Sequence, residues 1–269
     1  MNHIQVTIEA DEEKQEILIA LLSDLNAVGF EQTGTHLVAY FPENDFPSYD
    51  VSAALTGHTF QTTTVAETNW NEEWEKNFDP VVVDDFCAVR AHFHEPLKGV
   101  EHDILITPKM SFGTGHHATT FLMMRGMRTI DLQGKRVFDF GTGTGVLAIL
   151  AEMRGAASVL ATDIDEWSIR NSLENVENNG CSRITIELND SVPAGQSFDV
   201  ILANINRNVI LAHFPALKEA LAGNGTILFS GLMTSDRGAI IGAGETLGLR
   251  LVEDKERSNW ISLLFVNGM

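Results

Sequence analysis

The chain has 269 residues, 44% of them hydrophobic, which is enough to build the core of one or two domains. It has a formal net charge of −19, which argues against direct binding of DNA or RNA as its main activity. We find no apolar run long enough to cross a bilayer, no secretory signal pattern, and only two cysteines, Cys87 and Cys181. We therefore expect a cytoplasmic protein without a membrane segment or a disulfide framework.

The acidic charge is concentrated in the first part of the chain. Residues 1–110 hold 20 acids and 5 bases, whereas residues 111–269 hold 17 acids and 13 bases. Such an excess would attract a basic partner. A solvated acidic surface that keeps the protein soluble is the alternative interpretation.

The first 66 residues are predicted to form a small α+β domain. Alternating apolar positions and turn residues predict strands over 4–9, 30–33, 37–41 and 59–65, with helices over 11–28 and 49–55. This β-α-β-β-α-β order is the split βαβ, ferredoxin-like pattern. No residue pattern within it indicates catalysis.

A short aromatic segment follows this domain. Trp70, Trp74 and Phe78 recur every four residues, which predicts a connecting helix over residues 67–78 with one packed face. An aromatic platform for substrate is the alternative. Strand-like runs then occur over 81–83, 87–93 and 104–107. Histidines lie near Cys87, but their spacing matches no metal-binding motif, so no metal site is predicted.

Residues 137–147, V-F-D-F-G-T-G-T-G-V-L, predict a buried strand, a tight glycine turn and a helix N-terminus. Glycine lets the backbone approach a ligand closely and adopt positive φ. A dinucleotide-binding G-x-G-x-x-G would require glycine at position 146, where Val146 stands. The loop spacing therefore disfavours an NAD-dependent oxidoreductase.

A second glycine loop, F-G-T-G-H-H-A-T-T over residues 112–120, precedes a predicted helix over 118–129. Its backbone amides and threonine hydroxyls are potential donors to a ligand. An ordinary capped helix is the alternative interpretation.

The rest of the chain alternates strands with helices. Strands are predicted over 158–162, 184–188, 198–203 and 226–230, helices over 147–153, 166–178, 209–221 and 235–246, and a terminal antiparallel pair over 249–256 and 260–266. This alternation predicts an α/β fold with a doubly wound, mainly parallel sheet that binds its ligand at the carboxyl ends of the strands.

Three polar residues follow predicted strands at that edge. Asp163 is placed to accept hydrogen bonds from ribose hydroxyls, and Asp190 could accept one from an adenine amino group. Asn204 would face the reactive end of the ligand. Together with the glycine loop they predict a pocket for an adenosyl group.

The two glycine loops, Asp163-Ile164-Asp165 and Ala203-Asn204-Ile205 together resemble the PrmA family of ribosomal-protein methyltransferases. The resemblance covers essentially the whole chain. It implies a Rossmann-like, seven-stranded S-adenosylmethionine-dependent domain over residues 79–269 and substrate recognition by residues 1–66. The implied reaction methylates amino groups, namely lysine side chains and the N-terminal amine, of the basic stalk-base protein of the large ribosomal subunit. Asn204-Ile205-Asn206 replaces the N-P-P-Y motif of enzymes that methylate glutamine or adenine, which favours an amine acceptor.

The resemblance also assigns site residues, which join those that the loops and strand ends suggest. The candidate cofactor-binding residues are Phe112, Thr114, Thr120, Asp139, Gly141, Gly143, Asp163, Asp190 and Asn204. Asn204 is also the candidate catalytic residue, because it would orient the acceptor amine. The expected protein is a monomer. The alternatives are a methyltransferase that acts on another protein or a small molecule, and a ribosome-assembly factor without enzymatic activity.

Overall fold

The computed structural model describes residues 3–23, 25–65, 79–109 and 113–268. The chain divides into two compact units, Met1–Phe78 and Asp79–Met269. The predicted connecting helix over residues 67–78, with its three aromatic residues, lies outside the described residues. Within the described parts of the chain, no helix is both long and apolar enough to span a membrane.

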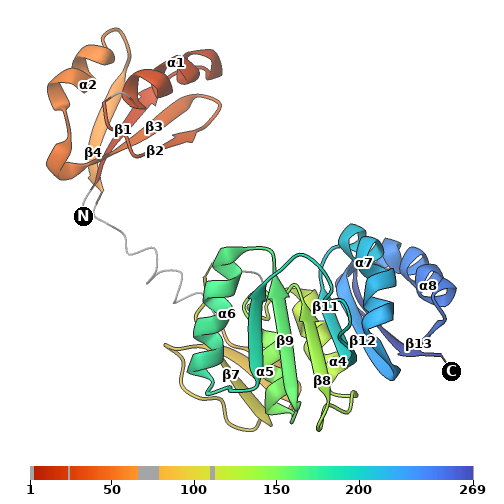
Figure 1. Ribbon diagram of the computed structural model, residues 1–269. Coiled ribbons are helices and arrows are strands. Elements are labelled where there is room, and N and C mark those ends of the chain that lie inside the picture. Colours follow the sequence, from red (N-terminus) through yellow and green to blue (C-terminus); the bar gives the residue numbers. More distant parts are fainter. Residues whose placement is uncertain (1–2, 24, 66–78, 110–112, 269) are drawn as a thin grey trace. The chain divides into compact units, whose positions relative to one another are not determined.

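The first unit is an antiparallel sheet with two helices (Figure 1). Its elements are β1 (His3–Glu9), α1 (Glu12–Ser23), β2 (Gly29–Gln32), β3 (His36–Pro42), the 3-10 helix η1 (Glu43–Asp45), α2 (Ser48–Ala54) and β4 (Phe60–Val65). The strand order is β2-β3-β1-β4, and each neighbouring pair is antiparallel. This is the order of elements that the alternating apolar positions predict.

A small apolar core holds this unit together. Val6 and Ile8 of β1, Leu18 and Leu22 of α1 and Phe41 of β3 are almost fully buried in one cluster. The two strand residues lie two positions apart and the two helix residues four apart, so each element turns one apolar face inward.

The second unit carries the larger sheet. Its elements are β5 (Val81–Val83), β6 (Cys87–Ala91), β7 (His102–Ile106), α4 (Ala118–Met127), β8 (Arg136–Phe140), α5 (Val146–Met153), β9 (Ser158–Asp163), α6 (Glu166–Asn178), β10 (Ile184–Leu188), β11 (Phe198–Asn204), α7 (Arg207–Ala220), β12 (Leu221–Met233), η2 (Thr234–Asp236), α8 (Arg237–Thr246), β13 (Leu249–Arg257) and β14 (Trp260–Asn267). The first three strands form a separate sheet in the order β5-β6-β7.

The seven remaining strands form one sheet in the order β10-β9-β8-β11-β12-β14-β13. Strands β8 to β12 pair in parallel, and β14 pairs antiparallel with both β12 and β13. The strand order reverses direction at β8, from which β9 and β10 extend to one side and β11 and β12 to the other. The predicted doubly wound, mainly parallel sheet of seven strands is therefore confirmed, and ligands of such sheets bind at this reversal point.

Strand β8 sends its side chains to different faces of this sheet. Phe138 and Phe140 belong to the apolar core that also holds Phe214 of α7. Asp139 stands between the two phenylalanines and therefore points to the opposite face, where α5 packs on β8. The acid of the glycine motif is thus under the helix that follows the loop.

Several boundaries differ from the sequence prediction, among them the starts of α7 and β12. Helix α7 begins at Arg207, two residues earlier than predicted, because the side chain of Asn206 accepts a hydrogen bond from the backbone N–H of Val209 and caps the helix. Strand β12 begins at Leu221, five residues earlier than predicted, through an irregular pairing with β11.

Candidate functional site

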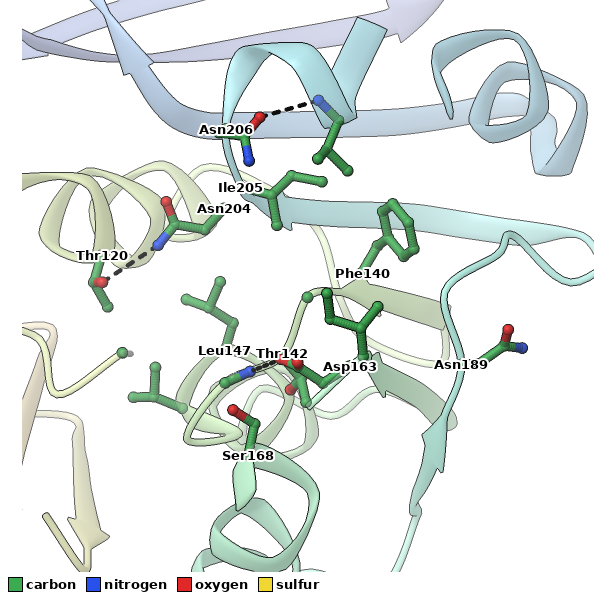
Figure 2. A pocket seen from close by; sticks show the side chains of 16 residues that line it. Thr120, Phe140, Thr142, Leu147, Asp163, Ser168, Asn189, Asn204, Ile205 and Asn206 are labelled. Carbon is green, nitrogen blue, oxygen red and sulfur yellow. Dashed lines mark hydrogen bonds between the residues drawn. The ribbon is translucent and has the colours of Figure 1, made fainter. Parts of the chain in front are cut away.

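The carboxyl ends of β8, β9 and β11 surround a cavity of about 300 Å³ (Figure 2). This volume is in the range of pockets that hold small molecules and cofactors. Five of the candidate residues line it: Thr120, Gly141, Gly143, Asp163 and Asn204. The structure therefore brings together residues from four separate parts of the sequence at the predicted edge of the sheet.

The glycine loop between β8 and α5 forms one wall of the cavity. Gly141, Gly143 and Gly145 all have positive φ, at 81°, 56° and 82°. A Cβ atom on Gly141 would overlap Cγ2 of Ile205, far inside van der Waals contact. Position 141 therefore needs glycine for both its backbone conformation and its space.

Asp163 is fixed against this loop from the end of β9. Its Oδ2 atom accepts a hydrogen bond from the backbone N–H of Gly143 at 2.9 Å, and Oδ1 accepts one from the backbone N–H of Asp165 at 3.0 Å. The backbone carbonyl of Thr162 also receives the N–H of Gly141 at 2.9 Å. Each carboxylate oxygen retains a lone pair, so the half-buried Asp163 can still accept from a ligand.

Asp139 does not line the cavity, contrary to the cofactor contact expected of it. The side chain is fully buried, and its Oδ2 accepts a hydrogen bond from Thr142 Oγ1 at 2.6 Å. Burial raises the pKa of Asp139 to about 7, the hydrogen bond from Thr142 opposes that rise, and the nearby charge of Asp163 adds to it. The buried carboxyl group of Asp139 thus holds the glycine loop through its hydrogen bond with Thr142.

Asn204, at the end of β11, faces α4. Its Nδ2 donates a hydrogen bond to Oγ1 of the fully buried Thr120 at 3.3 Å, as Figure 2 shows. Its Oδ1 is buried and has no hydrogen-bond partner among the described residues. A buried acceptor without a partner is costly, so a ligand that donates to Oδ1 would remove that cost.

The end of β10 contributes Asn189 to the cavity lining, and not the predicted Asp190, whose side chain is exposed. The backbone N–H of Asn189 donates to the carbonyl of Asp163 at 2.9 Å, which brings residue 189 beside Asp163. The expectation that polar residues after the strands line the ligand site identified the correct turn, but not which of its two polar residues faces the cavity.

The second glycine loop adds Gly113 to the lining, while Thr114 does not reach it. The hydroxyl of Thr114 is 3.2 Å from Nδ1 of His116, within the loop itself. Thr144 Oγ1 donates to the carbonyl of Gly113 at 2.8 Å, so the two glycine loops are in direct contact. Phe112, the remaining candidate, lies outside the described residues.

Sequence reasoning missed several lining residues. Ile205 and Asn206 follow Asn204 directly, and Ile164, which is 75% exposed, follows Asp163 at the cavity. An apolar residue immediately after a strand-end acid is a signal that could have indicated Ile164, because a flat adenine ring needs an apolar contact.

The described residues contain no group of three or more His, Cys, Asp or Glu arranged to hold a metal ion. The residues present do fit an adenosyl cofactor. Bare glycine backbone would accommodate its close approach, Asp163 can accept from sugar hydroxyls, and Asn204, whose buried Oδ1 lacks a partner among the described residues, lines the same cavity.

Comparison with known proteins agrees with this geometry. Residues 3–267 match the family model described as "Ribosomal protein L11 methyltransferase (PrmA)". The ribosomal protein L11 methyltransferase of Porphyromonas gingivalis is 42% identical over 93% of this chain and 90% of its own length. That of Phocaeicola vulgatus is 36% identical over 99% of both chains.

A solved structure gives the same result for the fold. The crystal structure of the ribosomal protein L11 methylase from Lactobacillus delbrueckii subsp. bulgaricus superimposes with a TM-score of 0.67 at 29% identity, over 71% of this chain and all of that one. The family match over nearly the whole length carries the assignment. The chain therefore belongs to the PrmA family of ribosomal protein L11 methyltransferases, which depend on S-adenosylmethionine.

Proposed function

We propose that this chain transfers methyl groups from S-adenosylmethionine to amino groups of ribosomal protein L11, namely lysine side chains and the N-terminal amine. The observation that carries the proposal is the cavity itself, which Asp163, Asn204 and the bare backbone of Gly141 and Gly143 line together. The family match supports both the donor and the protein substrate.

Five residues of this chain would hold the donor. The backbone at Gly141 and Gly143 would pass closest to it, since no side chain intervenes there. Asp163 would accept hydrogen bonds from the ribose hydroxyls, and Asn189 with Ile164 would border the adenine. Because Gly143 already fixes the carboxylate of Asp163 at 2.9 Å, little ordering of that side chain would be needed on binding.

When bound, S-adenosylmethionine supplies an electrophilic methyl group on a positively charged sulfur. The acceptor must present a lone pair in line with that methyl group, and placement alone can lower the barrier by about 7–11 kcal/mol at best. A lysine with a pKa of about 10.4 is neutral in roughly one molecule in 2,500 at pH 7. Binding must therefore favour the neutral amine.

Asn204 would orient that amine. Its Oδ1 is the buried acceptor that lacks a partner among the described residues, and an amine N–H would provide one. Thr120 holds the other end of the amide, which limits rotation of the Asn204 side chain. Among the described lining residues, Asp163 alone has an ionisable side chain and it is assigned to the ribose, so water would remove the proton.

The first unit would bind the protein substrate. Residues 1–66 contain ten Asp and Glu and a single Lys or Arg, Lys14, so this unit would attract a basic ribosomal protein. A ribosomal substrate is also consistent with a cytoplasmic enzyme, and we propose that the chain acts as a monomer.

Incubation of the full chain with methyl-labelled S-adenosylmethionine and total ribosomal proteins tests the proposal. We expect label in the L11 band, and Asn204→Ala should lower the rate of labelling. Label in another protein band would identify a different acceptor. No label in any band would contradict protein methylation.

A further inference from the structure

Strand β7 is an edge strand of its three-stranded sheet, and helix α6 lies beside it. Asparagines of α6 and of its C-terminal cap form hydrogen bonds with backbone groups of β7 and of Thr107, which follows it. Asn179 donates to the carbonyl of Leu105 at 2.6 Å and accepts from its N–H at 2.9 Å. Asn175 accepts from the N–H of Thr107 at 2.7 Å, and Asn171 donates to its carbonyl at 3.0 Å. These asparagines are four residues apart, so they lie along one face of the helix.

Asn175 differs from the other two because it also reaches the cofactor side of the fold. Its Nδ2 donates to the backbone carbonyl of Thr144 at 2.8 Å, and the whole side chain is buried. Thr144 in turn donates through Oγ1 to the carbonyl of Gly113 at 2.8 Å. One continuous path of hydrogen bonds therefore joins Thr107, Asn175, Thr144 and Gly113.

This path connects the described part of the second glycine loop, residues 113–120, with Thr107 earlier in the chain. Thr107 precedes that loop, and Gly113 lies within it and lines the cavity. The fixed point between them is Thr144, in the glycine loop between β8 and α5. A Cβ atom on Gly113 would lie 2.7 Å from Thr144 Oγ1, so the contact between the two loops is close as well as hydrogen-bonded.

We propose that Asn175 is a positioning residue for the cofactor site, which fixes the two glycine loops relative to each other through Thr144. This inference rests on the proposed function, because it assumes that the cavity between these loops holds S-adenosylmethionine. Loss of the Asn175 amide would leave the buried carbonyl of Thr144 and the N–H of Thr107 without their partners. The loops would then no longer be held at the separation that the cofactor requires.

Asn179 provides a matched control at the end of the same helix. Asn175→Ala and Asn179→Ala each remove hydrogen bonds to the edge of β7 or its continuation, and both should lower thermal stability. Only Asn175→Ala also frees the loop between β8 and α5. In the full chain without cofactor, we expect amide hydrogen exchange in residues 141–147 to rise in Asn175→Ala and to stay at the wild-type rate in Asn179→Ala.

Calorimetric titration with S-adenosylmethionine gives the second readout. We expect Asn175→Ala to raise the dissociation constant about tenfold, as for one lost buried hydrogen bond, and Asn179→Ala to leave it within about twofold. Thr144→Val removes the donor to Gly113 without disturbing β7, so it should weaken binding as Asn175→Ala does. It therefore tests the same path of hydrogen bonds if Asn175→Ala folds poorly. Thr144→Ser keeps the hydroxyl and should bind like wild type.

Equal dissociation constants for Asn175→Ala and Asn179→Ala, with wild-type exchange over residues 141–147 in both, would overturn the positioning role. A wild-type chain that failed to bind S-adenosylmethionine would instead overturn the proposed function. The exchange comparison would still decide whether Asn175 holds the loop, so the two failures can be told apart.

Discussion

Asp163 Oδ2 accepts the backbone N–H of Gly143 at 2.9 Å, and this hydrogen bond joins the end of β9 to the glycine loop that follows β8. The two residues are 20 positions apart in sequence, and parallel pairing of β8 with β9 brings them together. The carboxylate is therefore already oriented toward the cavity. Preorganisation of this kind reduces the entropy that a binding site loses when it takes up its ligand.

The close contact between Gly141 and Ile205 predicts that no side chain is tolerated at position 141. Gly141→Ala should lose cofactor binding and lower stability by about 1–3 kcal/mol or more, because a left-handed backbone is strained and the new Cβ meets Ile205. Thermal unfolding and calorimetry measure both effects. Gly134→Ala is the control, since Gly134 also has positive φ, 70°, but has no atom within 4 Å of an added Cβ. Equal losses in both variants would contradict the steric explanation.

Asn204 gives a prediction about catalysis. Asn204→Ala should reduce kcat by roughly 10- to 100-fold, as for one or two hydrogen bonds lost in the transition state, with a smaller change in S-adenosylmethionine affinity. Steady-state kinetics with L11 as the acceptor separates the two effects. Thr120→Val keeps the Asn204 amide and removes the hydroxyl that holds it at the cavity wall, so its effect on kcat should be smaller. A wild-type kcat in Asn204→Ala would exclude the residue from acceptor orientation.

The buried acid beneath the loop gives a prediction about pH. Folding raises the pKa of Asp139 from its usual 3.8 to about 7, so the folded protein binds the proton more tightly than the unfolded chain. Its contribution to stability is therefore complete below about pH 4 and is lost as the pH rises toward 7. Asp139→Asn imitates the protonated acid and removes this loss.

Thermal unfolding of the wild type and Asp139→Asn across this range is the corresponding measurement. The difference in Tm, variant minus wild type, should increase from about pH 4 to about pH 7 and then level off. Other ionisable groups are common to both proteins and cancel in the difference. A difference that stays constant with pH would show that Asp139 is ionised throughout.

Charge in the first unit gives a prediction about the protein substrate. Because residues 1–66 carry ten acids and one Lys or Arg, the KM for a basic ribosomal protein should rise steeply with salt, whereas the affinity for S-adenosylmethionine should change little. Neutralising the exposed Glu43, Asp45 and Asp50 together, as Gln, Asn and Asn, should flatten the salt dependence. The same slope in this triple variant would place the docking surface elsewhere.

The order and type of the elements were predictable because apolar periodicity and glycine turns are local signals. The prediction was least accurate where side-chain direction depends on tertiary pairing. Asp139 belongs to the D-x-G-x-G-x-G motif, but its place between two core phenylalanines sends it beneath the loop. The side-chain alternation of β8 already contained that information.

The turn after β10 shows the same limit. Asn189 and Asp190 are adjacent polar residues, and it is Asn189, whose backbone N–H donates to the carbonyl of Asp163, that borders the cavity. The contacts of Asn175 were equally hidden, because its partners Thr107 and Thr144 lie 68 and 31 residues away. No pattern within α6 indicates these contacts.

The most direct test of the central claim is a calorimetric titration of S-adenosylmethionine into the wild type, Asp163→Ala and Asp190→Ala. We predict that Asp163→Ala weakens binding roughly 10- to 100-fold, or about 1.5–3 kcal/mol, through the loss of ribose hydrogen bonds. Asp190→Ala should bind like the wild type, because this exposed residue is outside the cavity lining. Unchanged affinity in Asp163→Ala, or a wild type that does not bind the donor, would contradict the account.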